Sequence, residues 1–270
     1  MSFQRYPLAT VQKVSQVIRE ALVIPTTTPQ QLISKELSQE DDTEEATLPD
    51  SLDALGDLFR LGDIPEDNLP APNAEGRWYI STVDPAQALF KIPGLWTRAG
   101  IRLITYLQCQ PDGGVGMTWA LPELLSTTEY LEEAIATANG PHPPQPKGAL
   151  PNVVEALEGD GSLSSFLSAS IFLRELKEFG RFGKHARWTH HRFVDSLPSQ
   201  VNWQWRTNAP QDFAPKVVTL PDGQVVVEFF SCRVLKPIAL FRHVDRYASN
   251  SYQSQNADQV IAVAGPASGK

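Results

Sequence analysis

The sequence contains little cysteine and no long hydrophobic run, and both absences restrict the class of protein. Only Cys109 and Cys232 occur among its 270 residues, so we expect no disulfide framework and no thiolate metal site. The longest apolar runs, such as Val225–Val227 with Phe229–Phe230, are far shorter than the ~20 residues that cross a bilayer. Residues 1–7 lack a basic start followed by a long apolar segment, so no secretory signal is predicted. We therefore expect a soluble, cytoplasmic protein without a membrane partner.

The negative charge is concentrated at one end of the chain. The formal net charge is −8, and residues 1–70 contain five Lys and Arg against 13 Asp and Glu. The remaining residues therefore contain 18 of each sign. This balance argues against a general nucleic-acid binder but is compatible with a local basic face.

Residues 1–75 are predicted to form an acidic, loosely attached helical arm. Apolar spacing indicates one helix from about Thr10 to before Pro25, a second from Thr28 to Leu37 and a third from Asp50 to near Gly62. The acidic run 39–47 between the second and third helices is typical of a solvated linker.

Residues 76–259 show strand signals and are predicted to form the body. Two Pro-Asp-Gly turns lie between alternating apolar runs and predict antiparallel hairpins at 101–121 and 216–235. Helices are expected at 126–139 and 162–179; the first half of the latter should be buried and its second half amphipathic. The fold class is therefore α+β, with one antiparallel sheet of five to seven strands and packed helices.

Residues 260–270 are predicted to form a flexible tail. Their sequence, V-I-A-V-A-G-P-A-S-G-K, resembles the strand and phosphate loop that open P-loop kinases of the uridine kinase or phosphoribulokinase type. Ala264 and Gly269-Lys270 match the loose A/G-x4-G-K form, but the following Ser or Thr and the phosphate-binding helix are missing. We infer no kinase activity; the alternative to a tail is that the chain is the upstream part of a split or truncated fusion.

The strongest sign of a site lies between Gly180 and Arg206, where three of the five histidines and three of the six tryptophans are interleaved with cations. Such a mixture suits a surface that binds an anionic partner. If residues 181–189 are extended, Arg181, His185 and Arg187 share one face. Further cations would join this row from the C-terminal strands: Arg233, Lys236, Arg242, His243 and Arg246.

The candidate partner-binding residues are Arg181, Lys184, His185, Arg187, Trp188, His190, His191 and Arg192. A second docking element is expected in the arm, at Leu52, Leu55, Leu58 and Phe59, either for a partner or as a cover for the basic row. The alternative is structural: the arginines would pair with Glu175, Glu178, Asp195 and Glu228, while the tryptophans fill the core.

Metal and nucleophile chemistry have little support. His185, His190 and His191 do not have the spacing of metal ligands, and no G-x-S-x-G motif is present. The two cysteines lie in strand patterns, which favours core packing. The His243–Asp245 pair has a spacing of two, which by itself identifies no acid–base pair. We expect no metal and no cofactor.

Three hypotheses follow for the function. The first is a non-catalytic binding or regulatory protein whose basic-aromatic face engages an acidic protein segment or another anionic ligand. The second is binding of RNA or a single-stranded nucleic acid. The third is an enzyme with an unrecognised His/Arg site in the same face, which a pocket around His185, His190, His191 and Asp195 would favour.

Overall fold

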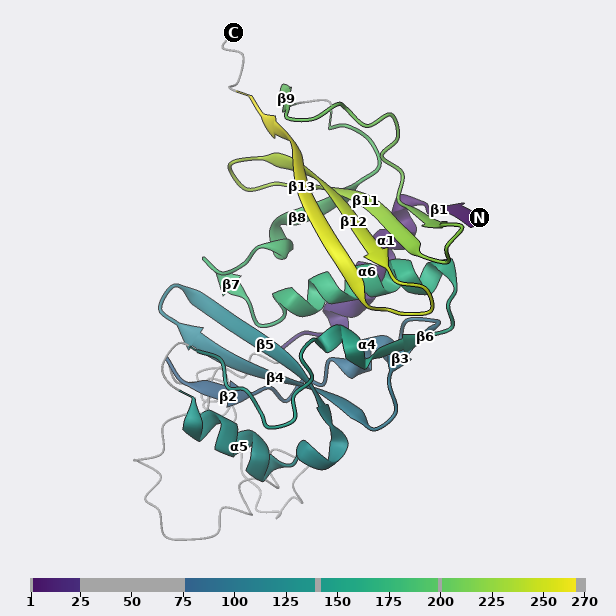
Figure 1. The fold of residues 1–270 in the computed structure, drawn as a ribbon. Coiled ribbons are helices and arrows are strands. Elements are labelled where there is room, and N and C mark those ends of the chain that lie inside the picture. The colour runs from purple at the N-terminus through teal and green to yellow at the C-terminus, as the bar shows by residue number, and fades with distance from the viewer. Residues whose placement is uncertain (1, 25–75, 139–141, 199–200, 266–270) are drawn as a thin grey trace, which may run out of the picture. The chain divides into compact units, whose positions relative to one another are not determined.

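The computed structural model of the chain describes residues 2–24, 76–138, 142–198 and 201–265 (Figure 1). The predicted helices at 28–37 and 50–62, the acidic run 39–47 and the four arm docking residues lie outside these ranges, as do residues 266–270. None of the described helices is long and apolar enough to cross a membrane.

The largest element of the fold is an antiparallel sheet of seven strands. Its main path runs in the order β1, β10, β11, β12, β13 and β9, and β8 pairs with β11 beside this path. The strands are β1 (Ser2–Arg5), β8 (His191–Val194), β9 (Trp203–Trp205), β10 (Lys216–Thr219), β11 (Val225–Arg233), β12 (Ala239–Tyr247) and β13 (Ser254–Ala264). Along one edge of β11, residues 225–228 pair with β10 and residues 230–233 pair with β8.

The remaining strands form two smaller antiparallel sheets. One contains β2 (Trp78–Ile80), β4 (Ile101–Gln110), β5 (Gly113–Pro122) and β7 (Phe182–Gly183), and the other pairs β3 (Leu95–Thr97) with β6 (Leu157–Gly159). The α+β class and both Pro-Asp-Gly hairpins, β4–β5 and β10–β11, are confirmed. The strands are divided among three sheets because α6 separates the two larger ones.

Helix α6 (Leu163–Glu178) lies between the two larger sheets and contacts β5 on one side and β10 and β11 on the other (Figure 1). The Ser162 side chain caps its start by accepting a hydrogen bond from the Ser165 amide. Within the described ranges the other helices are α1 (Leu8–Ala21), α4 (Ala86–Phe90) and α5 (Thr128–Thr137), with single 3-10 turns η2 (Glu123–Leu125), η3 (Val153–Ala156) and η4 (Trp188–His190).

Three boundaries differ from the prediction. Residues 2–24, predicted as part of the arm, belong to the body: β1 pairs with β10, and α1 packs on α6 with Val11 and Ile18 fully buried. Residues 260–264, predicted as tail, extend β13. The second half of α6, predicted to reach the surface, is buried even at Arg174, Glu175 and Glu178. Their partners are remote in the sequence or follow the helix: α1 contacts Glu175, the large sheet contacts Arg174, and η4 contacts Glu178.

Candidate functional site

The segment that follows α6 is not the extended row that the alternation predicts. Gly180 has φ +79°, and a Cβ there would lie 2.2 Å from the Leu107 side chain, so the chain turns sharply at this point. A two-residue strand, β7, is followed by turns and then by η4 and β8. The side chains from Arg181 to Arg192 therefore point to different surroundings.

Two buried carboxylates of α6 hold this segment in place. Glu178 Oε1 accepts the backbone N–H groups of Arg187 and Thr189, at 2.7 and 2.9 Å, and so fixes η4. Glu175 Oε1 accepts the indole N–H of Trp188 at 2.9 Å, and its carboxylate also pairs with Arg19 of α1. Neither carboxylate is paired with an arginine of the segment, so the predicted neutralisation by Glu175 and Glu178 is wrong.

Three of the predicted binding residues are occupied elsewhere. Trp188 is buried in the core, which removes it from any binding face. Lys184 forms an ion pair with Asp112 at the β4–β5 turn. His185 Nε2 lies 2.8 Å from Gln110 Oε1 of the same hairpin. The last two side chains therefore face the four-stranded sheet and not the β8–β11 pair.

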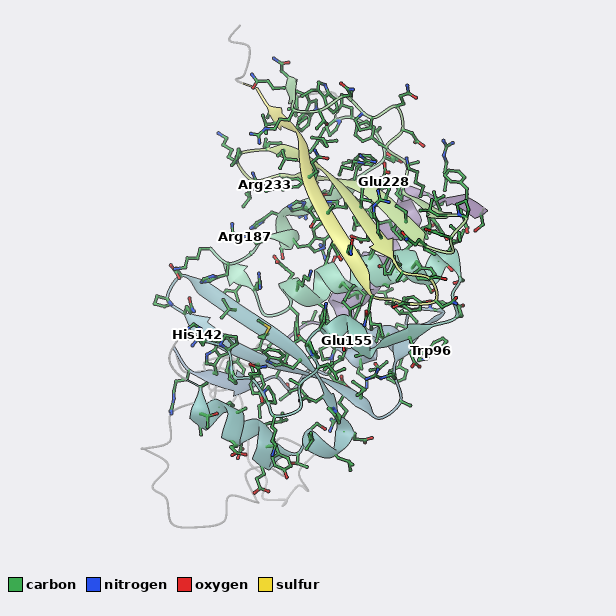
Figure 2. All side chains as sticks on the ribbon, viewed as in Figure 1. Trp96, His142, Glu155, Arg187, Glu228 and Arg233 are labelled. Carbon is green, nitrogen blue, oxygen red and sulfur yellow. The ribbon has the colours of Figure 1, made fainter. Side chains whose placement is uncertain are left out.

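A cluster of cations remains where η4 and β8 meet the end of β11. The backbone carbonyl of His190 accepts a hydrogen bond from the Val234 amide. In the β8–β11 ladder, Arg192 lies opposite Cys232 and His191 lies opposite Arg233. Figure 2 places the labelled Arg187 and Arg233 along the same side of the ribbon. We call these cations the basic rim: Arg187, His190, Arg192, Arg233 and Lys236. They surround the strand end from both faces of the sheet, because Arg192, opposite Cys232, projects from the other face than Arg233, opposite His191.

No side chain of the basic rim has a carboxylate partner within the described ranges. The guanidinium groups of Arg192 and Arg233 bond only to backbone carbonyls, and Arg233 also lies over the Phe241 ring at 5.6 Å. Arg181, predicted as a member, lies at the end of α6 with its Nε buried and unpaired. Two predicted extensions of the row lie elsewhere: His243 is buried, and Arg242 pairs with Glu228 on the other face of the sheet.

Behind the basic rim lies a continuous chain of hydrogen bonds that crosses the inner face of the large sheet. His191 Nδ1 lies 2.8 Å from Ser231 Oγ, and Ser231 Oγ lies 2.7 Å from His243 Nε2. His243 Nδ1 in turn lies 2.7 Å from Asp258 Oδ1. These four side chains come from β8, β11, β12 and β13, and we call them the relay.

The direction of each bond in the relay follows from its carboxylate end. An ionised Asp258 can only accept, so His243 donates from Nδ1 and leaves Nε2 as an acceptor. Ser231 must then donate its hydroxyl to His243 Nε2, and its oxygen accepts Nδ1–H of His191. His191 is thereby assigned the tautomer whose Nε2 carries no proton.

Burial and charge keep the relay neutral at its histidines and ionised at Asp258. Burial lowers the pKa of His191 to about 4, and the neighbouring His243 and Arg233 add to the effect. Burial also lowers the pKa of His243, although its bond to Asp258 acts in the opposite direction. Burial alone would raise the pKa of Asp258, but His243 and Arg174 hold it well below its usual range.

Arg174 of α6 anchors the far end of the relay. Its guanidinium is bidentate on Asp245, at 2.6 and 2.9 Å, and also donates to Asp258 at 2.7 Å. Arg174 and Asp245 are almost completely inaccessible to solvent. Asp245, two residues from His243 in the sequence, therefore pairs with the arginine, while Asp258 accepts the hydrogen bond from His243.

The Asp258–His243–Ser231 part of the relay has the order of a hydrolytic triad, but its surroundings do not suit acyl transfer. Ser231 is 0% exposed, and its strand is paired on both sides, with β8 and β12. A nucleophile needs room for a substrate and free N–H groups for an oxyanion. Four hollows on the described chain are lined by other residues. The relay can orient His191 and pass a proton along its bonds.

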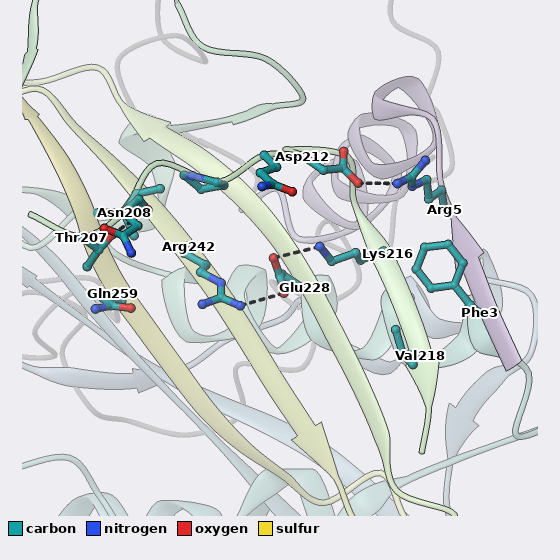
Figure 3. A pocket seen from close by; sticks show the side chains of 13 residues that line it. Phe3, Arg5, Thr207, Asn208, Asp212, Lys216, Val218, Glu228, Arg242 and Gln259 are labelled. Carbon is teal, nitrogen blue, oxygen red and sulfur yellow. Dashed lines mark hydrogen bonds and ion pairs between the residues drawn. The ribbon is translucent and has the colours of Figure 1, made fainter. Parts of the chain in front are cut away.

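The largest of these hollows, about 720 Å³, lies on the opposite face of the large sheet (Figure 3). Each charged side chain named in the groove has a partner, although three cations share two carboxylates: Arg5 pairs with Asp212, and Glu228 accepts from both Lys216 and Arg242. The groove therefore offers a charged ligand no unpaired group of opposite sign. Among the described residues, no group of three or more His, Cys, Asp and Glu side chains is placed to hold a metal ion.

Sequence reasoning missed Ser231 and Asp258 and misplaced His243. The available signal was the presence of polar residues at the inward-facing positions of two apolar strands. Ser231 occupies such a position in β11, and His243 and Asp245 occupy such positions in β12. The pairing of three strands, which no local pattern specifies, brings these residues together.

Comparison with protein-family models, with curated proteins and with solved structures finds no match for this chain.

Proposed function

We propose that this chain is a non-catalytic binding protein whose basic rim engages an acidic segment of a partner protein. One observation carries the proposal: the rim cations come from adjoining segments, η4, β8 and the end of β11, and have no carboxylate partner in the described chain, whereas the groove cations Arg5, Lys216 and Arg242 on the other face of the sheet are all paired. Unpaired cations in a cluster attract carboxylates because each new ion pair lowers their mutual repulsion.

The surroundings of the rim favour a polypeptide over a nucleic acid. Val234 and Leu235, between Arg233 and Lys236, are 46% and 51% exposed. Two apolar side chains among cations suit a segment that alternates carboxylates with apolar residues. Trp188, the aromatic ring on which a nucleic-acid base would stack, lies in the core.

Titration of the full chain with poly-L-glutamate tests the proposal. We compare the wild type with the variant Arg187→Gln/Arg192→Gln/Arg233→Gln/Lys236→Gln. A matched control removes four exposed lysines elsewhere: Lys13→Gln/Lys91→Gln/Lys147→Gln/Lys177→Gln. Exposed ion pairs contribute about 0.2–1 kcal/mol each, so the rim variant should lose about tenfold or more in affinity.

The control variant should lose less than about threefold, because its lysines are scattered. Equal losses in the two variants would mean that poly-L-glutamate responds only to net charge, and unchanged affinity of the rim variant would overturn the proposal. Tighter binding of a single-stranded oligonucleotide than of poly-L-glutamate at the same salt concentration would favour the nucleic-acid alternative.

A further inference from the structure

His191 is the end of the relay that reaches the basic rim. Its Nδ1 is engaged by Ser231, whereas its Nε2 has no partner among the described residues and is not among the buried unpaired atoms. The ring is half-buried. It stacks on Trp188 with 5.1 Å between centroids and lies 4.7 Å from the Phe241 ring. These contacts fix the ring plane, so Nε2 is an oriented acceptor at the surface.

Arg233 lies directly opposite His191 in the β8–β11 ladder. Directly opposed residues of antiparallel strands project from the same face with Cβ atoms about 5 Å apart. The ionisable groups around the ring are Arg233 of β11, His243 of β12, Asp258 of β13 and the neighbouring His190. Arg233 and the two histidines oppose a positive charge on His191, while Asp258 favours it.

We propose that His191 takes up a proton when a carboxylate of an acidic ligand binds at the basic rim, so that its Nε2–H and Arg233 hold that carboxylate together. The inference rests on the proposed function and adds to it the chemistry of one contact. The proton comes from solvent and bonds to the Nε2 lone pair, giving an imidazolium that donates from both nitrogens.

The relay makes this uptake possible without any rearrangement. Since Nδ1–H already donates to Ser231, protonation at Nε2 leaves the three bonds of the relay as they are. Burial is the main obstacle to a positive charge on His191, and a bound carboxylate compensates for it by pairing with the imidazolium; its negative charge also offsets the repulsion from Arg233. His243 cannot take this role, because both of its nitrogens are engaged inside the relay.

Isothermal titration with poly-L-glutamate at pH 6.5, in two buffers of different ionisation enthalpy, counts the protons taken up. The wild type should show uptake that approaches one proton, and its affinity should rise by up to about tenfold per pH unit on acidification. His191→Asn keeps a side-chain N–H for Ser231 but cannot titrate; it should bind with almost no uptake. His190→Asn removes one member of the basic rim and should bind more weakly, but the ligand that binds should still bring the proton with it.

Uptake that persists in His191→Asn and disappears in His190→Asn would overturn the inference and assign the proton to His190. Binding by the wild type without uptake would overturn it as well. Failure of the wild type to bind poly-L-glutamate would instead refute the proposed function.

Carbon-13 NMR of the histidine rings gives a second test that needs no variant of the relay. In the free chain, the His191 ring should remain neutral from pH 8 to 5.5 because of its low pKa. With poly-L-glutamate bound, the same ring should titrate at a higher pH. Binding that shifts the His190 resonance while His191 stays neutral at every pH would rule out the inferred contact.

Discussion

At the scale of single residues, the stability of the interior depends on the carboxylates that pair with one buried cation. Arg174 donates four hydrogen bonds: two to Asp245, one to Asp258 and one to the Ser170 carbonyl. Only its Nε lacks a partner. Its guanidinium also lies over the Phe229 ring at 4.9 Å. The removal of one carboxylate would therefore leave a buried charge with too few partners.

Asp245→Asn tests this dependence. The amide preserves the shape but not the charge, and we expect a loss of about 3 kcal/mol in the free energy of unfolding, because Asp258 remains as the only carboxylate. Urea denaturation measures the loss. Asp212→Asn breaks the more exposed pair with Arg5 and should cost less than about 1 kcal/mol. Similar small losses in both variants would show that Arg174 does not need Asp245.

At the scale of elements, α6 determines where the basic rim lies. The Glu178 carboxylate accepts the two η4 amides, and η4 leads directly into β8, which carries His191 and Arg192. Hydrogen bonds to an ionised carboxylate are stronger than those to a neutral oxygen. The last turn of a core helix therefore fixes a surface feature.

Glu178→Gln should weaken this anchor. We expect a loss of about 1–2 kcal/mol in stability and faster amide hydrogen exchange at Arg187 and Thr189. Glu133→Gln, at an exposed position of α5, is the matched control and should change neither quantity. Unchanged exchange at both amides in Glu178→Gln would mean that the packing of Trp188 alone holds η4.

Elements with local signals were predictable from the sequence. The two hairpins follow from Pro-Asp-Gly turns, and Gly223 has the positive φ that such a turn requires. The core half of α6 follows from its apolar composition. The burial of Glu175 was not predictable, because the α1 residues Ser15 and Arg19 that contact it lie more than 150 positions earlier. The burial of Glu178 depends on the turn that brings the η4 amides back onto it.

At the scale of the whole molecule, the relay exists because antiparallel pairing aligns distant residues. His243 lies opposite Phe229 on one side and Asp258 on the other, and Ser231 lies two residues from Phe229 on the same face. The sequence separates His191 from Asp258 by 67 positions. The cations after Gly180 predicted which segment of the chain contains the candidate site. They did not predict which of these cations have no carboxylate partner in the described structure.

The relay should also make the molecule sensitive to mild acid. In the unfolded chain His191 and His243 titrate near pH 6.5, whereas in the folded chain both pKa values are lowered, that of His191 to about 4. Between pH 6.5 and 4 the unfolded state therefore binds more protons, and stability must fall as the pH falls. Asp258 adds to this slope only at the acid end of the window, because it stays ionised in the folded state while the unfolded state begins to bind a proton there as the pH approaches 4.

Urea denaturation at pH 7, 6, 5 and 4.5 measures the slope, which is at most about 1.4 kcal/mol per pH unit for each proton. His191→Asn removes one of the two titrating groups and should reduce the slope, whereas the exposed His142→Asn should leave it unchanged. The direction of this pH dependence matters for the basic rim. Acidification lowers the stability of the fold, but it strengthens the inferred contact between His191 and a ligand carboxylate. A bound acidic ligand should therefore protect the protein most at the lower end of the window, because it binds the folded state together with the proton that free His191 resists.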